Sequence, residues 1–205
     1  MRKYYSQCGE DKYIYEKYFQ HMNIENPIYF EAGALDGVKY SNTKFFEESL
    51  GWNGILVEPN PFEYKKLITN RSEKNYFYNS ILSNSNEELD FIYVKGCHSA
   101  VSGITNTLPS SHYSKYLNHS NTIEEKMKPI SLDKALENVS KVDFFVLDVE
   151  GHELEVLQSF SFDKAIYVMM VENLDVKNNK IQNFLESKDY ILVEIFHQNE
   201  IYMKK

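Results

Sequence analysis

Short runs of apolar residues recur along the chain, and the stretches between them carry apolar residues at helical spacing. A run of about four to eight apolar residues bounded by turn residues is typical of a buried β-strand. The expected strands begin near Ile28 and Gly54 and cover 75–82, 89–94, 142–147 and 167–171. One expected helix contains Ile14, Tyr18 and Phe19. Further helices are expected over 44–50, 62–69, 132–138, 154–160 and 178–186.

Strands that alternate with helices predict a mostly parallel sheet with helices on both faces. The segments 190–194 and 200–203, joined by a turn-like stretch, predict a C-terminal antiparallel hairpin, and 89–94 could also pair antiparallel. We therefore expect one α/β domain over residues 1–205, a length sufficient for one core. Residues 1–27 should form an N-terminal arm and a helix ahead of the first strand.

The periodic pattern is lost between residues 95 and 127, which are rich in Ser, Thr, Asn and His. A loop of this length inside a compact domain is usually functional or disordered. The functional interpretation is a lid or an acceptor-binding wall, with 96–103 as its best candidate for direct contact. The alternative is a mobile surface loop, in which His98, His112 and His119 are solvated polar residues and not ligands.

The first strand leads into a glycine turn that carries candidate chemistry. Glu31 precedes Gly33 and Gly37, and Ser41 or Asn42 can cap the following helix. The turn lacks the middle glycine of the dinucleotide pattern G-x-G-x-x-G. A carboxylate two residues before the first glycine would repel phosphate and attract an ammonium group. This favours a cofactor with an amino-acid head group, such as S-adenosylmethionine.

The second strand also ends in a carboxylate. Glu58 is followed by Pro59, by Asn60 and by Pro61 at an expected helix start. A carboxylate at this strand end is suited to accept hydrogen bonds from both hydroxyl groups of a ribose. The alternative for Glu31 and Glu58 is that each binds backbone amides of the adjoining loop.

Composition narrows the classes of function. The net charge is −8, and the absence of a long Lys/Arg run argues against a nucleic-acid partner. Cys8 and Cys97 have no metal-site spacing and are too few for a disulfide framework. We see neither an apolar run of membrane-spanning length nor a signal peptide, so a cytoplasmic protein is expected. The oligomeric state is left open.

A third group of polar residues follows the two most apolar strands. Asp148, Glu150 and His152 come after 142–147, and Glu172 and Asn173 come after 167–171. Because such strand ends meet at one edge of a parallel sheet, Asp148, Glu150, His152 and Glu172 are candidate catalytic residues that could accept a proton. Asp148, Glu172 and Asn173 could instead hold Mg²⁺, which prefers oxygen ligands. The structural alternative is that the acidic residues stabilise the N-terminus of the next helix.

Four stretches together resemble the FkbM-type methyltransferases. They are Ser6-Gln7-x-Gly9-Glu10-Asp11, Glu31-Ala-Gly33-Ala-Leu-Asp36-Gly37 with Ser41-Asn42-Thr43, Gly51-Trp52-x-Gly54 with Glu58-Pro59-Asn60-Pro61, and Asp148-Val-Glu150-Gly151-His152-Glu153. The resemblance spans nearly the whole chain in the expected order. Aspartate is also common in that family at the position of Glu31.

The resemblance implies a class I, Rossmann-like, S-adenosylmethionine-dependent O-methyltransferase acting on a hydroxyl group of a sugar or glycan. It also implies the following cofactor-binding residues: Glu31, Gly33, Asp36, Gly37, Ser41, Asn42, Glu58, Pro59, Asn60 and Asp148. Segment 95–127 does not align, so the acceptor stays open.

Three further functions compete with this hypothesis. A dehydrogenase or nucleotide-sugar enzyme is disfavoured by the glycine spacing and by Glu31. A ribose 2′-O methyltransferase acting on RNA is disfavoured by the acidic charge and by the lack of an obvious catalytic lysine at the strand ends. A binding or scaffold protein that has lost catalysis is disfavoured by the intact acidic strand ends.

Overall fold

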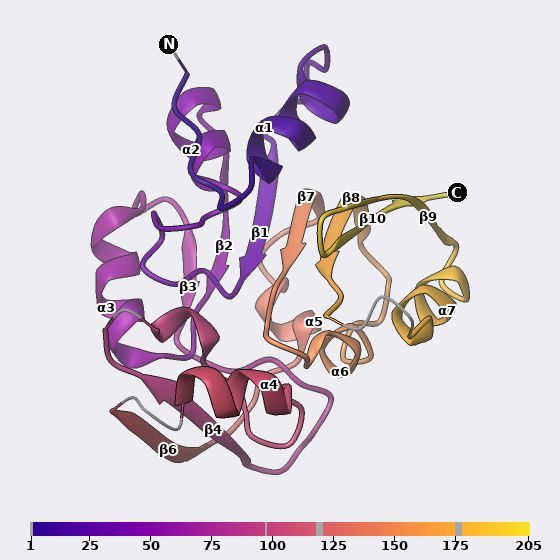
Figure 1. The fold of residues 1–205 in the computed structure, drawn as a ribbon. Helices are drawn as coiled ribbons and strands as arrows, with labels where there is room; N and C mark the ends of the chain where they lie inside the picture. The colour runs from indigo at the N-terminus through magenta and orange to yellow at the C-terminus, as the bar shows by residue number, and fades with distance from the viewer. Residues whose placement is uncertain (1, 97, 118–120, 175–177) are drawn as a thin grey trace.

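The computed structural model describes residues 2–96, 98–117, 121–174 and 178–205, so Cys97 and His119 lie outside the described residues. The described residues form a seven-stranded sheet with the order β3-β2-β1-β7-β8-β10-β9 (Figure 1). Its strands are β1 (Ile28–Ala32), β2 (Asn53–Val57), β3 (Tyr76–Tyr78), β7 (Lys141–Leu147), β8 (Ala165–Glu172), β9 (Tyr190–Phe196) and β10 (Asn199–Lys204). The expected mostly parallel sheet with a C-terminal antiparallel hairpin is confirmed.

The second strand of the C-terminal hairpin, and not the first, pairs with the parallel part of the sheet. β10 pairs antiparallel with both β8 and β9, so it lies inside the sheet and β9 forms the edge. Burial explains this order, because Ile201 and Tyr202 of β10 are fully buried, whereas Ile195 of β9 is 53% exposed. The inner strand is thus the more buried of the two, although β9 contains more apolar residues.

Helices cover both faces of this sheet. Successive side chains of a strand point to opposite faces, and in β7 Phe144 packs with one helix layer while Phe145 packs with the other. One layer contains α1 (Glu10–Ile14), the π-helix η1 (Tyr15–Phe19), α2 (Lys44–Leu50) and α3 (Pro61–Asn70). The other contains α5 (Leu132–Ala135), α6 (Glu153–Leu157) and α7 (Lys180–Glu186).

The segment expected to lack regular structure forms a second, smaller sheet. Residues 89–94 do not join the main sheet; as β4 (Leu89–Val94) they pair antiparallel with β5 (Gly103–Ile104) and β6 (Thr122–Met127). The short helices η2 (Ser99–Val101), α4 (Ser110–His112) and η3 (Tyr113–Leu117) lie between β4 and β6. The described part of the expected lid or surface loop over 95–127 therefore contains short strands and helices that the sequence does not indicate. β6 is largely exposed along its length, so it carries no apolar period that the sequence could reveal.

Some element bounds also differ from the expected ones. β3 covers only three residues of the expected 75–82 strand, and the chain beyond it meets Ile130 through an isolated bridge to Leu82. The expected helix 132–138 ends three residues earlier, at Ala135.

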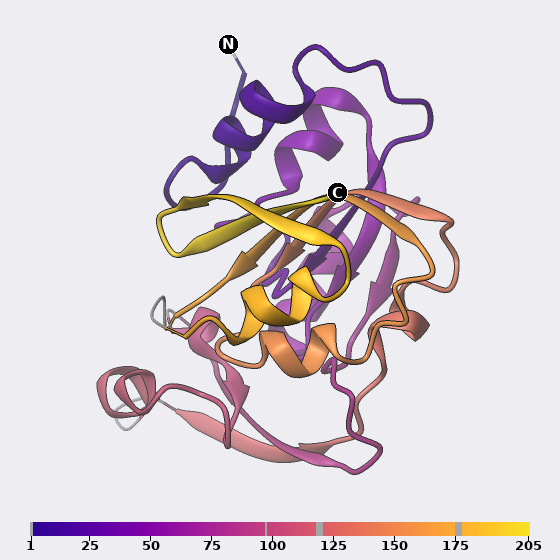
Figure 2. The same ribbon diagram turned by 90° about the vertical axis from the view of Figure 1, so that its right-hand side faces the viewer.

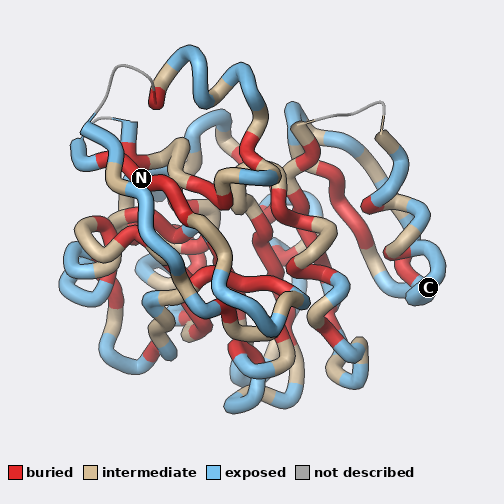
Figure 3. Tube along the Cα trace, turned by 90° about the horizontal axis from the view of Figure 1, so that it is seen from below, coloured by how far each residue is buried: buried red, intermediate tan, exposed pale blue. Residues whose placement is uncertain are grey.

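The small sheet lies beyond the carboxyl ends of the parallel strands, as two perpendicular views show (Figures 1 and 2). Seen from that side, buried residues run through the central strands and exposed residues gather on the surrounding helices and loops (Figure 3). Of the helices described, none combines the length and the apolar character needed to cross a membrane.

Candidate active site

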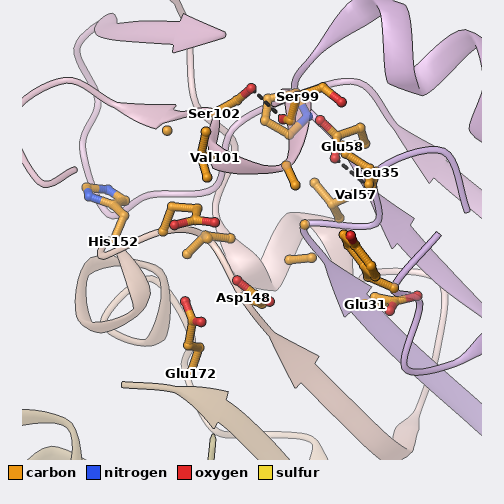
Figure 4. Close-up of a pocket in the computed structure, with 18 of the residues that line it drawn as sticks. Glu31, Leu35, Val57, Glu58, Ser99, Val101, Ser102, Asp148, His152 and Glu172 are labelled. Carbon is orange, nitrogen blue, oxygen red and sulfur yellow. Dashed lines mark hydrogen bonds between the residues drawn. The ribbon is translucent and has the colours of Figure 1, made fainter. Parts of the chain in front are cut away.

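A cavity of about 300 Å³ opens at the carboxyl ends of β1, β2, β7 and β8. The strand ends form one side, and Ser99, Val101 and Ser102 of the small sheet's connections form the opposite wall (Figure 4). In open α/β sheets this is where ligands bind. The predicted site residues that line the cavity are Glu31, Gly33, Asn42, Glu58, Pro59, Asp148, Glu150, His152 and Glu172.

The turn after β1 is locked between its two neighbouring strands. Gly33 has a φ of +82°, and a Cβ atom there would lie 1.9 Å from the carbonyl oxygen of Asp148. The N–H groups of Gly33 and Ala34 both donate to the carbonyl oxygen of Val57 at 3.1 Å. These groups are therefore unavailable to phosphate, which dinucleotide folds bind at the equivalent turn.

Glu31 is buried and holds the loop that follows the turn. Its carboxylate accepts hydrogen bonds from Ser41 Oγ (2.8 Å), from the Asn42 N–H (2.7 Å) and from Thr43 Oγ1 (2.6 Å). Arg71 Nη1 lies 3.5 Å from Glu31 Oε2, so the charge is compensated inside the protein. Glu31 thereby positions Asn42, whose buried Oδ1 faces the cavity wall without a hydrogen-bond partner among the described residues.

Five predicted residues, all within the described part of the chain, do not line the cavity. Asp36 Oδ1 accepts from the next two N–H groups of its own turn, those of Val38 and Lys39. Asn60 caps α3 by accepting from the Phe62 N–H at 3.1 Å. These contacts shape the loops around the cavity, and a direct role in cofactor binding stays a prediction. The five are Asp36, Gly37, Ser41, Asn60 and Asn173.

Glu58 is 5% exposed and receives one backbone N–H on each carboxylate oxygen. Leu35 donates to Oε2 and Asn60 donates to Oε1, both at 2.8 Å. Burial raises the pKa of Glu58 to about 7, although these two hydrogen bonds oppose the rise. Each oxygen keeps a second lone pair, so the carboxylate can still accept hydrogen bonds from a ligand.

Three carboxyl groups meet at the ends of β7 and β8. Asp148 and Glu172 lie on neighbouring strand ends, and their side chains are close together (Figure 4). Their carboxyl groups share a hydrogen bond. Burial raises the pKa of Glu172, and the charges of Asp148 and Glu150 raise it further. Burial likewise raises the pKa values of Asp148 and Glu150. Glu150 also has a φ of +59°, a strained backbone conformation of the kind that clusters at functional sites.

His152 faces two hydroxyl groups. Its Nδ1 lies 3.2 Å from Thr107 Oγ1, and its Nε2 lies 3.0 Å from Ser83 Oγ. Burial lowers the pKa of His152, so the ring is neutral near pH 7. Because both nitrogens are engaged, His152 is better placed to hold the cavity wall than to take a proton. Glu153 Oε1 accepts the N–H groups of Val149 and Gly151, which matches the helix-terminus alternative.

The 95–127 segment is seated directly on the loop after β7. His112 Nδ1 lies 2.9 Å from Glu150 Oε2 without hydrogen-bond alignment. A Cβ atom on Gly151 would lie 2.7 Å from the Thr107 carbonyl oxygen, so the two backbones are in close contact. These contacts, together with Ser99 and Ser102 in the cavity wall, support the lid interpretation.

The predicted magnesium site stays a prediction, and one of its three expected ligands lies away from the cavity. Asn173 donates its side-chain amide to Glu200 Oε1 at 2.8 Å and does not line the cavity. Within the described ranges, no group of three or more His, Cys, Asp or Glu side chains is arranged to hold a metal ion. We derive no step through Mg²⁺.

Sequence reasoning missed several residues of the site. Gln7, Lys39, Tyr40 and Tyr116 line the cavity, and Arg71 is the counter-ion of Glu31. Gln7 lies within a stretch that carries the family resemblance, which was a usable signal. Arg71 comes 40 residues after its partner in the chain, and no local pattern indicates that contact.

Comparison with protein families gives one match. Residues 31–197 match the model of the methyltransferase FkbM domain. Searches of curated proteins and of solved structures returned no match.

Proposed function

Because the chain belongs to the FkbM methyltransferase family, we propose that it transfers the methyl group of S-adenosylmethionine to a hydroxyl group of a sugar or glycan. The family makes the protein a methyltransferase that depends on this cofactor. The oxygen acceptor and its carbohydrate class are our proposal.

One observation carries the fit to the cofactor. Of the buried side-chain nitrogen and oxygen atoms in the described residues, four have no hydrogen-bond partner. Three of these atoms are acceptors on residues that line the cavity: Asn42 Oδ1, Glu150 Oε2 and Glu172 Oε2. Unpartnered buried acceptors are costly and call for a ligand that brings donors or positive charge. The sulfonium and the ammonium of S-adenosylmethionine bring both, and the free lone pairs of Glu58 suit its ribose hydroxyls.

The cofactor supplies a methyl group on a sulfonium, which leaves as a neutral thioether. Asp148 is suited to take the proton of the acceptor hydroxyl, because its pKa is raised less than those of Glu150 and Glu172. Glu172, with the most strongly raised pKa, keeps its proton and can orient Asp148 through their hydrogen bond. Ser99 and Ser102 in the opposite wall offer hydroxyl oxygens to a polar acceptor.

The proposal is tested by turnover on a panel of acceptors. Purified protein is incubated with S-adenosylmethionine and with free sugars, nucleotide sugars, glycans or RNA, and formation of S-adenosylhomocysteine is followed. Mass spectrometry then locates the methyl group, and the Asp148→Asn variant serves as the inactive control. Methylation of carbohydrate hydroxyls supports the proposal. Turnover confined to RNA, or a methyl group on nitrogen or carbon, contradicts it.

A further inference from the structure

The N-terminal arm reaches the cavity, although it precedes the residues that match the family model. Gln7 lines the cavity together with Asn42, Lys39 and Tyr40. Ser6 forms an isolated bridge with Tyr40, which places Gln7 beside the loop that Glu31 holds. The charge of Glu10 also raises the pKa of Asp148. The arm is thus part of the cavity wall on the side of Glu31 and Asp148.

The turn that carries Gln7 is held firmly on both sides. Asp11 accepts hydrogen bonds from the N–H groups of Tyr5 (2.6 Å) and Ser6 (3.3 Å) and from Ser6 Oγ (2.7 Å). Glu10 Oε2 accepts the Cys8 N–H at 2.8 Å. The Gln7 side chain itself is exposed, and no hydrogen bond of it is found within the described ranges. A fixed backbone with an uncommitted carboxamide is the arrangement expected for a ligand contact.

Hydrogen-bond donors are scarce in this part of the cavity. Six backbone N–H groups around it are already used inside the protein: those of Gly33, Ala34, Leu35, Asn42, Val149 and Gly151. The ionised carboxylate of Asp148, which is also near this wall, would repel an anion. A ligand carboxylate would therefore rely on side-chain donors, and Gln7, Lys39 and Tyr40 supply them on this wall.

We propose that the side-chain amide of Gln7 binds the carboxylate at the amino-acid end of the cofactor, while Asn42 Oδ1 accepts from the neighbouring ammonium. This inference rests on the proposed function, since it takes S-adenosylmethionine as the cofactor. Gln7 then selects for a complete amino-acid end and acts on binding alone. Lys39, whose Nζ lies 4.7 Å from the centre of the Tyr40 ring, adds positive charge at the same place.

Two nucleosides distinguish a contact with the amino-acid end of the cofactor from a general effect on the cofactor site. S-adenosylhomocysteine carries the amino-acid end, and 5′-methylthioadenosine has the same nucleoside and sulfur without it. Calorimetry with wild type, Gln7→Ala, Gln7→Glu and a control, Gln20→Ala, measures both affinities. Gln20 is exposed and does not line the cavity. Gln7→Ala should lower the affinity for S-adenosylhomocysteine about 10-fold, which corresponds to the loss of one hydrogen bond to a charged group. Gln7→Glu should weaken it further, because like charges repel.

Binding of 5′-methylthioadenosine should stay unchanged in all variants, which also shows that the nucleoside site is folded. If Gln7→Ala weakens both nucleosides equally, or neither, the inference is overturned while the proposed function stands. If wild-type protein binds neither nucleoside, the proposed function fails and the inference fails with it.

Discussion

Two acidic regions at the cavity differ in how far their buried carboxyl groups are compensated by cations and hydrogen-bond donors. On the β1 side, Glu31 and Glu47 share the fully buried guanidinium of Arg71, and Glu31 also receives donors from the loop it holds. On the β7–β8 side, the described residues supply Asp148, Glu150 and Glu172 with no lysine or arginine partner, and two of their buried oxygens lack hydrogen bonds.

This difference separates fold from function. A satisfied buried carboxylate stabilises a loop, and the burial of Glu47 is outweighed by Arg71 and its neighbours, which lower its pKa to about 2. An unsatisfied cluster has raised pKa values and is destabilising until a ligand compensates it. We therefore expect substitutions on the first side to change stability and substitutions on the second to change binding and catalysis.

The largest effect is expected at Asp148. Asp148→Asn keeps the shape of the side chain and removes its charge and most of its basicity. Turnover on a verified acceptor should fall about 10²–10⁴-fold, the usual contribution of a general base. The affinity for S-adenosylhomocysteine, measured by calorimetry, should stay within a few-fold. Near-normal turnover would return Asp148 to a structural role.

On the opposite side, Arg71→Met should act on stability. It leaves Glu31 and Glu47 buried without their cation, which should lower the free energy of unfolding by about 3–5 kcal/mol. Urea denaturation measures this loss. Lys66→Met, in the helix α3 that ends just before Arg71, is the matched control. Its ion pair with Glu63 is about half exposed at the lysine and should be worth less than about 1 kcal/mol. Equal losses in the two variants would remove the distinction between the two sides.

The sequence predicts the strands and their acidic ends because both signals are local. Buried strands such as β7 are mostly apolar, and Glu58 follows β2 directly as Asp148 follows β7. The sequence does not reveal which carboxylate is compensated, because Arg71 reaches Glu31 from just beyond the end of α3, 40 residues along the chain. Local sequence patterns therefore locate the site, but they do not show which of its carboxyl groups have a compensating cation.

The small sheet was missed for a related reason. β4 was recognised as a strand, but its partners β5 and β6 are a two-residue strand and a largely exposed one. The pairing is carried by backbone hydrogen bonds between distant segments, which leave no apolar alternation in β6. The contacts of Thr107 and His112 with the loop after β7 depend on that pairing, so they could not be predicted either.

A smaller effect is expected at Glu58, which lies between the two sides. Glu58→Ala removes two acceptor oxygens from the proposed ribose site. It should weaken the binding free energy of S-adenosylhomocysteine by about 1–3 kcal/mol. Calorimetry with NAD on the wild type is the specificity control, and we expect much weaker binding. An unchanged affinity in Glu58→Ala would confine this residue to holding the N–H groups of Leu35 and Asn60.

The smallest expected effect is a change in the pH dependence of stability without ligand. Burial and the neighbouring carboxylates raise the pKa of Glu172 above its ordinary value of 4.5, so the folded protein binds this proton more tightly than the unfolded chain. Its stabilising contribution is therefore complete below pH 4.5 and declines as the pH rises toward the raised pKa. Glu172→Gln mimics the protonated acid and should make the decline of unfolding free energy shallower, by at most about 1.4 kcal/mol per pH unit. Urea denaturation between pH 5 and pH 8 measures the slope, with the exposed Glu16→Gln as the control. A slope that Glu172→Gln leaves unchanged would mean that the β7–β8 side is compensated after all, like the side held by Arg71.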